Sequence, residues 1–243
     1  MSEVGRIAID DGVAYVVWTP GGAVSARLPG KMLREVRAGR ALRPVVGDFV
    51  RVSAEGVIEE LQPRRTRLAR RAAGRRGVEQ VLAANVDIAL VATAAGADVN
   101  ERRLERYLTV VREGHVEPVV LLTKADASED LDAEIARVLQ AVGDVPVLAV
   151  SSSTGQGVAE VAALVSPNRL AVLLGSSGVG KSTLVNRLLG TDQQRVAGLR
   201  DDGTGRHTTT RREIFELPGG GFLVDTPGMR EVGLLDEPAG RRR

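Results

Sequence analysis

Three short polar segments, each placed directly after an apolar run, constrain the fold of this chain more than any other feature. They are Thr123-Lys124-Ala125-Asp126, the glycine-rich stretch 175–182 (GSSGVGKS), and Asp225-Thr226-Pro227-Gly228. Apolar runs that alternate with amphipathic helices predict a mainly parallel sheet covered on both faces. Ligands bind such sheets beyond the carboxyl ends of the strands, where all three segments are expected to lie. The sequence therefore predicts an α/β domain with one composite site.

This predicted domain comprises residues 79–243. We expect strands at 86–93, 118–123, 146–150, 170–174, 213–217 and 222–225, and helices at about 101–112, 130–142, 158–165 and 181–189. Every polar segment named above then begins where a buried strand ends. The order of these elements supports a doubly covered sheet, because helices separate the first strands.

Residues 1–68 have a different sequence pattern. Short strands are expected at 5–9, 13–18, 23–28, 48–52 and 57–61, with Gly, Pro or Asp between them. Five short strands in this span predict a small OB-type β-barrel, and an SH3-like barrel fits the pattern nearly as well. The first part of the chain is therefore predicted to be a separate barrel domain.

Arginine is concentrated between the two predicted domains. Residues 64–76 contain seven arginines and no acidic residue, and we interpret 69–78 as an arginine-rich linker. The side chains predicted to bind RNA phosphates are Arg64, Arg65, Arg67, Arg70, Arg71, Arg75 and Arg76. The simpler alternative is a solvated, flexible linker.

Composition excludes several classes of site. The 243 residues include no cysteine and only two histidines, so disulfides, a thiolate zinc site and a histidine-rich metal cage are excluded. A metal would have oxygen ligands, which suits magnesium. No apolar run approaches the length of a membrane span, and no signal peptide pattern is present. We expect a soluble, cytoplasmic, monomeric protein without a membrane partner.

The stretch 175–182 has the pattern of a phosphate-binding loop. A strand enters a glycine-rich turn and leaves as a helix, so backbone N–H groups converge on phosphate. We expect Lys181 to reach the β and γ phosphates of a nucleotide and Ser182 to bind magnesium. Asp225 is expected to hold magnesium through water, and the Gly228 N–H to contact the γ phosphate. By itself, the segment at 225–228 could also be an ordinary turn.

Residues 123–126 are predicted to recognise the base. The Asp126 carboxylate can accept hydrogen bonds from N1 and N2 of guanine, whereas adenine offers no such donors. An enzyme that uses ATP is therefore disfavoured. Lys124 is expected to lie along the base, and Ser151 and Ser152 to form a second base-contacting loop. Thr123 occupies the first position of this base-reading motif, where Asn is usual. Its single hydroxyl is then the group left to hold the loops of the site together.

The segment 201–210 (DDGTGRHTTT) is polar and glycine-rich, as expected of a mobile loop. Thr209, or alternatively Thr208, could complete the magnesium shell and close on the γ phosphate. Met229 stands where many GTPases carry the glutamine that orients water. His207 is the titratable candidate to replace it, although a lone loop histidine is often simply solvated.

The predicted catalytic residues are His207, Lys181 and Thr209, and the predicted metal ligands are Ser182, Thr209 and Asp225. The residues predicted to contact GTP are Thr123, Lys124, Asp126, Ser151, Ser152, Gly175, Ser176, Ser177, Gly178, Val179, Gly180, Lys181, Ser182, Thr183 and Gly228. Together they predict GTP as substrate and Mg²⁺ as cofactor, with attack of water on the γ phosphate.

The order of these motifs is rotated, because ordinary GTPases place the base-reading motif last. With this order and with further matches at 45–48 (VVGD), 79–87 (EQVLAANVD), 102–107 (RRLERY) and 205–210 (GRHTTT), the chain resembles the circularly permuted, ribosome small-subunit-dependent GTPases of the RsgA (YjeQ) family. The resemblance implies an N-terminal OB-type β-barrel followed by a circularly permuted P-loop GTPase domain. It also implies binding to the small ribosomal subunit late in its assembly, and GTP hydrolysis stimulated by that subunit. It supports His207 as the water-positioning residue and Thr209 as the switch threonine.

One feature departs from the family. Its members typically continue into a C-terminal zinc-binding domain, whereas 15 residues follow Gly228 here and no cysteine is present, so no zinc is expected. A natural short form and a truncated chain both fit. Contacts with ribosomal RNA would then depend on the barrel and the arginine-rich linker. A binding module that holds RNA and nucleotide but scarcely hydrolyses GTP is the alternative function.

Overall fold

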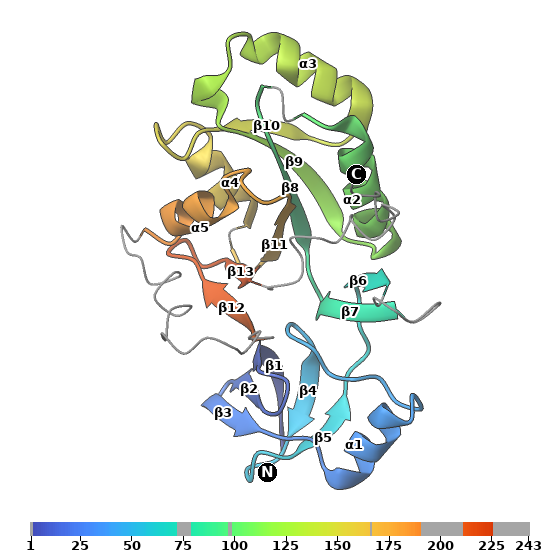
Figure 1. The fold of residues 1–243 in the computed structure, drawn as a ribbon. Coiled ribbons are helices and arrows are strands. Elements are labelled where there is room, and N and C mark those ends of the chain that lie inside the picture. The colour runs from blue at the N-terminus through green and yellow to red at the C-terminus, as the bar shows by residue number, and fades with distance from the viewer. Residues whose placement is uncertain (1, 72–78, 97–98, 166, 191–210, 226–243) are drawn as a thin grey trace, which may run out of the picture.

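The computed structural model describes residues 2–71, 79–96, 99–165, 167–190 and 211–225. Figure 1 shows two parts, a small barrel at the N-terminus and a larger α/β domain. No helix among the described residues is both long and apolar enough to span a membrane.

The N-terminal part is an OB-type barrel. Its strands are β1 (Glu3–Asp10), β2 (Tyr15–Thr19), β3 (Gly22–Ala26), β4 (Phe49–Val52) and β5 (Ile58–Leu61), which confirms the strands expected there. Strand β1 pairs with both β2 and β4, β4 pairs with β5, and a parallel bridge between Arg27 and Val57 brings the end of β3 to β5. This closure, with helix α1 (Gly30–Arg37) between β3 and β4, favours the OB arrangement over an SH3-like barrel.

The α/β domain contains a sheet in the order β10-β9-β8-β11-β13-β12. These strands are β8 (Ile88–Ala94), β9 (Glu117–Thr123), β10 (Val147–Val150), β11 (Leu170–Gly175), β12 (Arg212–Glu216) and β13 (Phe222–Asp225). All neighbouring pairs within it are parallel except β12 with β13, which is antiparallel. The mainly parallel sheet is therefore confirmed.

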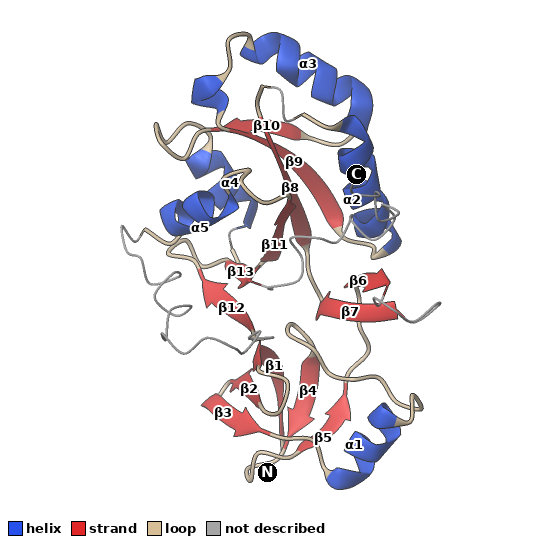
Figure 2. Cartoon of the chain, viewed as in Figure 1, coloured by secondary structure: helices blue, strands red, loops and turns tan. Residues whose placement is uncertain are grey.

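Helices cover both faces of this sheet (Figure 2). They are α2 (Glu101–Glu113), α3 (Leu131–Val142), α4 (Val158–Val165) and α5 (Lys181–Leu188), with a short 3₁₀ turn η1 (Ala125–Ala127) after β9. Alternate residues of β8 divide between two cores. Ala89 and Val91 pack with α2 and α3, whereas Ile88 and Leu90 pack with α4 and α5. A near-continuous apolar strand is what such double coverage requires.

A hairpin and a shared strand pair join the two parts. Strand β6 (Arg67–Arg71), which the sequence did not predict, pairs with β7 (Glu79–Ala84) and crosses from the predicted barrel into the predicted linker. Strand β1 of the barrel pairs antiparallel with β12, through Ile9 with Glu213 and Asp10 with Arg212. The barrel is therefore a continuation of the main sheet. The boundaries 1–68, 69–78 and 79–243 stay a prediction.

A buried carboxylate lies at this junction. Asp10 is 1% exposed and accepts hydrogen bonds from Arg43 at 3.1 Å and from Arg212 at 3.5 Å. Trp18 of β2 packs against Phe222 of β13, with ring centroids 5.8 Å apart. Because paired backbone, one ion pair and an aromatic contact cross the junction, the barrel is held against β12 and β13.

Candidate functional site

The segment between β11 and α5 has the geometry of a phosphate-binding loop. Gly175 has φ +140°, and a Cβ there would lie 2.4 Å from the Ala92 carbonyl oxygen of β8. Gly178 and Gly180 also have positive φ, +81° and +92°, which side chains rarely adopt. The pocket in front of the loop is lined by Ser177, Gly178, Gly180, Lys181, Ser182 and Thr183. The glycines are thus required by backbone conformation and by close approach to β8.

Lys181 turns back over this loop. Its Nζ donates to the Gly175 carbonyl at 2.7 Å and also to the Ser176 carbonyl. The ammonium is therefore held at the loop, close to an anion that binds the backbone N–H groups of the same loop. Ser182 and Thr183 follow in the first turn of α5, so their hydroxyls come from the same end of the helix.

Thr123 joins the loop that follows β9 to the phosphate loop. Its hydroxyl oxygen lies 2.6 Å from the carbonyl oxygen of Val179 and 3.1 Å from that of Thr93. The side chain is 3% exposed, so water does not compete for these acceptors. Threonine thus performs, with one hydroxyl, the linking role for which asparagine is usual.

Asp126 lies in the 3₁₀ turn after β9, exposed to solvent at the same edge of the sheet. Hydrogen bonds from the Ser151 and Ser153 hydroxyls hold the pKa of its carboxyl below the usual value. The Ser153 hydroxyl donates to Asp126 Oδ2 at 2.8 Å. The preceding Lys124 adopts φ +56°, which turns the chain sharply out of the strand. The carboxylate is therefore ionised and oriented as an acceptor.

The loop after β10 supports Asp126 from the other side. Ser151 is fully buried, and its Oγ accepts from the Thr154 backbone N–H at 3.1 Å while contacting Ser153 Oγ at 3.0 Å. Ser152 lies between them and is half-buried. Ser153, which the sequence did not single out, therefore acts on Asp126 together with Ser151.

Arg103 is a second residue that sequence reasoning missed. It lies in the first turn of α2, where Asn100 caps the helix, and its Nη1 donates to Ser176 Oγ at 2.5 Å. Ser176 is therefore held twice, by Lys181 through its carbonyl and by Arg103 through its hydroxyl. The match at 102–107 offered a signal, but nothing in it indicated a contact with residue 176.

Several predicted site residues lie outside the described part of the chain: His207, Thr208, Thr209, Gly228, Arg75 and Arg76. Asp225 ends β13, as the sequence predicted. Because β13 is parallel to β11, with Val224 opposite Val172, the backbone of Asp225 lies beside the strand that leads into the phosphate loop. By residue type, serine and aspartate supply oxygen donors of the kind that magnesium prefers, so the chemistry of Ser182 and Asp225 fits the ion.

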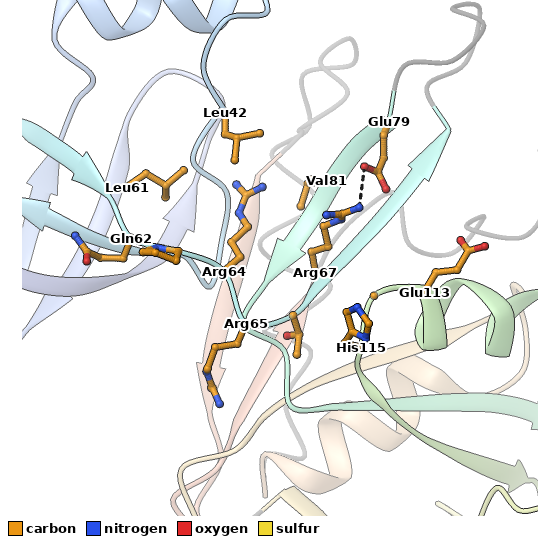
Figure 3. Close-up of a pocket in the computed structure, with 13 residues that line it drawn as sticks. Leu42, Leu61, Gln62, Arg64, Arg65, Arg67, Glu79, Val81, Glu113 and His115 are labelled. Atoms are coloured by element: carbon orange, nitrogen blue, oxygen red, sulfur yellow. Dashed lines mark ion pairs between the residues drawn. The ribbon is translucent and has the colours of Figure 1, made fainter.

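A second pocket lies at the junction of barrel, β7 and α2 (Figure 3). It is lined by Leu42, Leu61, Gln62, Pro63, Arg64, Arg65, Thr66, Arg67, Glu79, Val81, Glu113, Gly114 and His115.

The arginines of this region are largely engaged. Arg64 is 10% exposed and donates to both oxygens of buried Asp48, at 2.8 and 2.7 Å, so it holds the barrel together. Arg65 pairs with Asp87 at 3.3 Å, and Arg67 pairs with Glu79 at 3.4 Å, drawn as the dashed line in Figure 3. Arg70 Nε donates to Gln80.

Comparison with known proteins agrees with this architecture. The protein-family model described as RsgA GTPase matches residues 61–235 of this chain. The chain belongs to the RsgA GTPase family. It is 41% identical to the small ribosomal subunit biogenesis GTPase RsgA of Methanosarcina acetivorans, over 97% of this chain and 64% of that protein. It is 43% identical to the protein of the same name in Streptomyces avermitilis, over 96% of this chain and 64% of that protein. The chain therefore spans somewhat under two thirds of these RsgA relatives.

Two solved structures show the same fold as this RsgA family member. YjeQ from Thermotoga maritima superposes with a TM-score of 0.71 at 23% identity, over 96% of this chain and 77% of YjeQ. YloQ, described as a circularly permuted GTPase, superposes with a TM-score of 0.65 at 23% identity, over 98% of this chain and 75% of YloQ. The likeness confirms the predicted permuted GTPase fold.

Proposed function

We propose that this chain binds and hydrolyses GTP and that the small ribosomal subunit, during its assembly, stimulates the hydrolysis. The observation that carries the proposal is the linkage of two half-sites. The Thr123 hydroxyl connects the loop that bears Asp126 to the phosphate loop that bears Lys181. A site with an ionised base-reading carboxylate at one end and a cationic phosphate loop at the other fits a guanine nucleotide.

The phosphates would lie on the loop from Gly175 to Thr183, with Lys181 moving from the loop carbonyls to the β and γ phosphates. Ser182, Asp225 and Thr209 would hold magnesium, which neutralises phosphate charge when bound. Most of the catalysis is then positioning and charge stabilisation. We assign the orientation of the attacking water to His207.

The base would be recognised by the Asp126 carboxylate. An ionised carboxylate can accept from both N1 and N2 of guanine, and the serine hydroxyls that lower its pKa also fix its direction. Lys124 would lie against the base, and the loop with Ser151 and Ser152 would close over its carbonyl edge. Adenine would leave the carboxylate without a donor.

The name shared by the relatives, small ribosomal subunit biogenesis GTPase, is the basis for the proposed partner. Ribosomal RNA would supply the phosphates for the basic surface of the barrel region. Of the predicted arginines, Arg65 and Arg67 are about half or more exposed and could exchange their acidic partners for phosphate, whereas Arg64 is committed to Asp48. We propose that the chain acts as a monomer in the cytoplasm.

Base recognition tests the nucleotide part of the proposal. Asp126→Asn replaces one acceptor oxygen with a donor amide, so preference should shift from GTP to xanthosine triphosphate, in which C2 carries an oxygen instead of the amino group of guanine. Asp130→Asn is the matched control, because Asp130 caps α3 and asparagine caps equally well. Competition binding with both nucleotides is the measurement. An unchanged preference for GTP in the Asp126 variant would refute the assignment.

A further inference from the structure

We propose that helix α1 and the turn after it form the main surface through which the barrel binds the backbone phosphates of folded RNA. This basic face of α1 consists of Lys31, Arg34, Arg37 and Arg40. It extends the proposed function, from which the RNA partner comes, and it was not predicted from the sequence. The region expected to bind RNA was the arginine-rich stretch 64–76.

The basic residues are arranged as a stripe. Lys31, Arg34 and Arg37 are three residues apart on the helix, so their side chains are neighbours on one side, about 4.5 Å apart along the axis. All of them are exposed, as is Arg40. Figure 1 shows α1 at the outer end of the barrel, far from β11 and α5. The basic face of α1 can therefore contact a large partner while the nucleotide site stays open.

These cations have no acidic partner among the ion pairs of the described residues. The predicted RNA-binding arginines just before the linker differ, because Arg64, Arg65 and Arg67 each pair with a carboxylate. A paired arginine must give up that carboxylate before it binds phosphate, whereas an unpaired one only releases counterions from the RNA. The basic face of α1 is therefore the better phosphate binder.

The face by which OB barrels usually bind nucleic acid is poorly suited here. That face is formed by the second and third strands, together with the loop between the first two strands and the loop between the fourth and fifth. Strands β2 and β3 carry no lysine or arginine, and Trp18 of β2 packs against Phe222 of the GTPase domain. Phosphate binding by the barrel is thus expected to come from α1 instead.

RNA fits this helix better than an anionic membrane does. A helix that lies in a membrane surface needs an exposed apolar side. Met32 packs against the barrel core, and neither Leu33 nor Val36 is exposed. The helix is also only eight residues long. What α1 offers to a partner is charge without apolar area.

The test compares two triple variants that remove the same charge. One is Lys31→Gln with Arg34→Gln and Arg37→Gln in α1. The control changes Arg102, Arg106 and Arg112 of α2 to Gln, because α2 interleaves its arginines with three glutamates and should bind no phosphate. Glutamine is a good helix former, so both helices should persist, which thermal unfolding verifies.

Binding of the whole chain to a 20-base-pair RNA duplex and to purified small ribosomal subunits is measured over a range of salt concentrations. Each phosphate contact adds about one to the slope of log affinity against log salt. The α1 variant should reduce that slope by about 2 to 3 relative to the unmodified chain. The α2 variant should leave it nearly unchanged.

Three results would overturn the proposal: an unmodified chain that does not bind the duplex, an α1 variant that keeps the full slope, or equal losses in both variants. A loss seen on phosphatidylserine vesicles but not on RNA would assign the surface to membranes instead. GTP binding is measured on the same variants. Its absence in the unmodified chain would refute the proposed GTPase function, and the RNA comparison would still decide the role of α1.

Discussion

The single hydroxyl of Thr123 should determine how well the phosphate loop is held in place. Thr123→Val keeps the shape of the side chain and removes only the donor. Two carbonyl oxygens then lose their hydrogen-bond donor. They are those of Val179, 2.6 Å from the Thr123 hydroxyl, and of Thr93, 3.1 Å from it. Because one hydroxyl carries one proton, the two contacts amount to one hydrogen bond at a time.

The expected cost follows from the burial of this site. A hydrogen bond contributes about 1 kcal/mol net to the free energy of unfolding. Because the variant also leaves a buried carbonyl without a donor, we expect a total loss of about 1.5 kcal/mol. For a chain of this size, that loss lowers Tm by about 3–6 °C. If the loop loosens by the same free energy, nucleotide affinity falls by about tenfold.

Thermal unfolding and titration with a fluorescent GDP analogue measure the two effects. Thr123→Ser is the control, because serine keeps the hydroxyl and should retain most of the affinity. The reasoning fails if the valine variant melts and binds nucleotide like the unmodified chain, since the two loops would then be held together by other contacts.

Other contacts of the site lead to further predictions. Arg103→Ala should weaken GDP binding by about tenfold, because the loss of one charge-assisted hydrogen bond has about that effect. Arg102→Ala, on the exposed side of α2, is the control and should leave GDP binding unchanged. Equal effects of the two variants in a binding titration would count against the contact. His207→Ala should abolish subunit-stimulated hydrolysis and leave GTP affinity intact, and full retained turnover would contradict its role. Ser153→Ala should let the pKa of Asp126 rise toward its usual value. Because GDP binding needs the ionised carboxylate, the variant should lose GDP affinity at a higher pH than the unmodified chain as the solution is acidified. The same midpoint of this loss in both proteins would refute the prediction.

Much of the α/β domain could be predicted because its signals are local. The apolar strand before Gly175 and the positive-φ glycines of the loop follow from short-range patterns. Helix α1 gave weaker signals. It follows Pro29 without a side-chain cap, has no acidic residue in its first turn and is only eight residues long. Strand β6 was missed because its three arginines made the segment read as part of a charged, arginine-rich stretch.

Long-range contacts could not be predicted from such patterns. The pairing of β1 with β12 joins Asp10 to Arg212, residues more than 200 positions apart (|i−j| = 202), and no local periodicity encodes it. The contact of Arg103 with Ser176 likewise depends on how α2 packs against the sheet. The sequence thus indicated which groups would gather at the nucleotide site, and the fold supplied the residues that hold them.

The coupling of GTP turnover to a ribosomal partner is the central claim. Its most direct test is the rate of GTP hydrolysis by this chain with and without purified small ribosomal subunits, with large subunits as the control. We predict slow hydrolysis by the chain alone and a marked increase with small subunits only. Nucleotide binding with no increase on addition of small subunits would contradict the account and would favour an RNA-binding module that scarcely hydrolyses GTP.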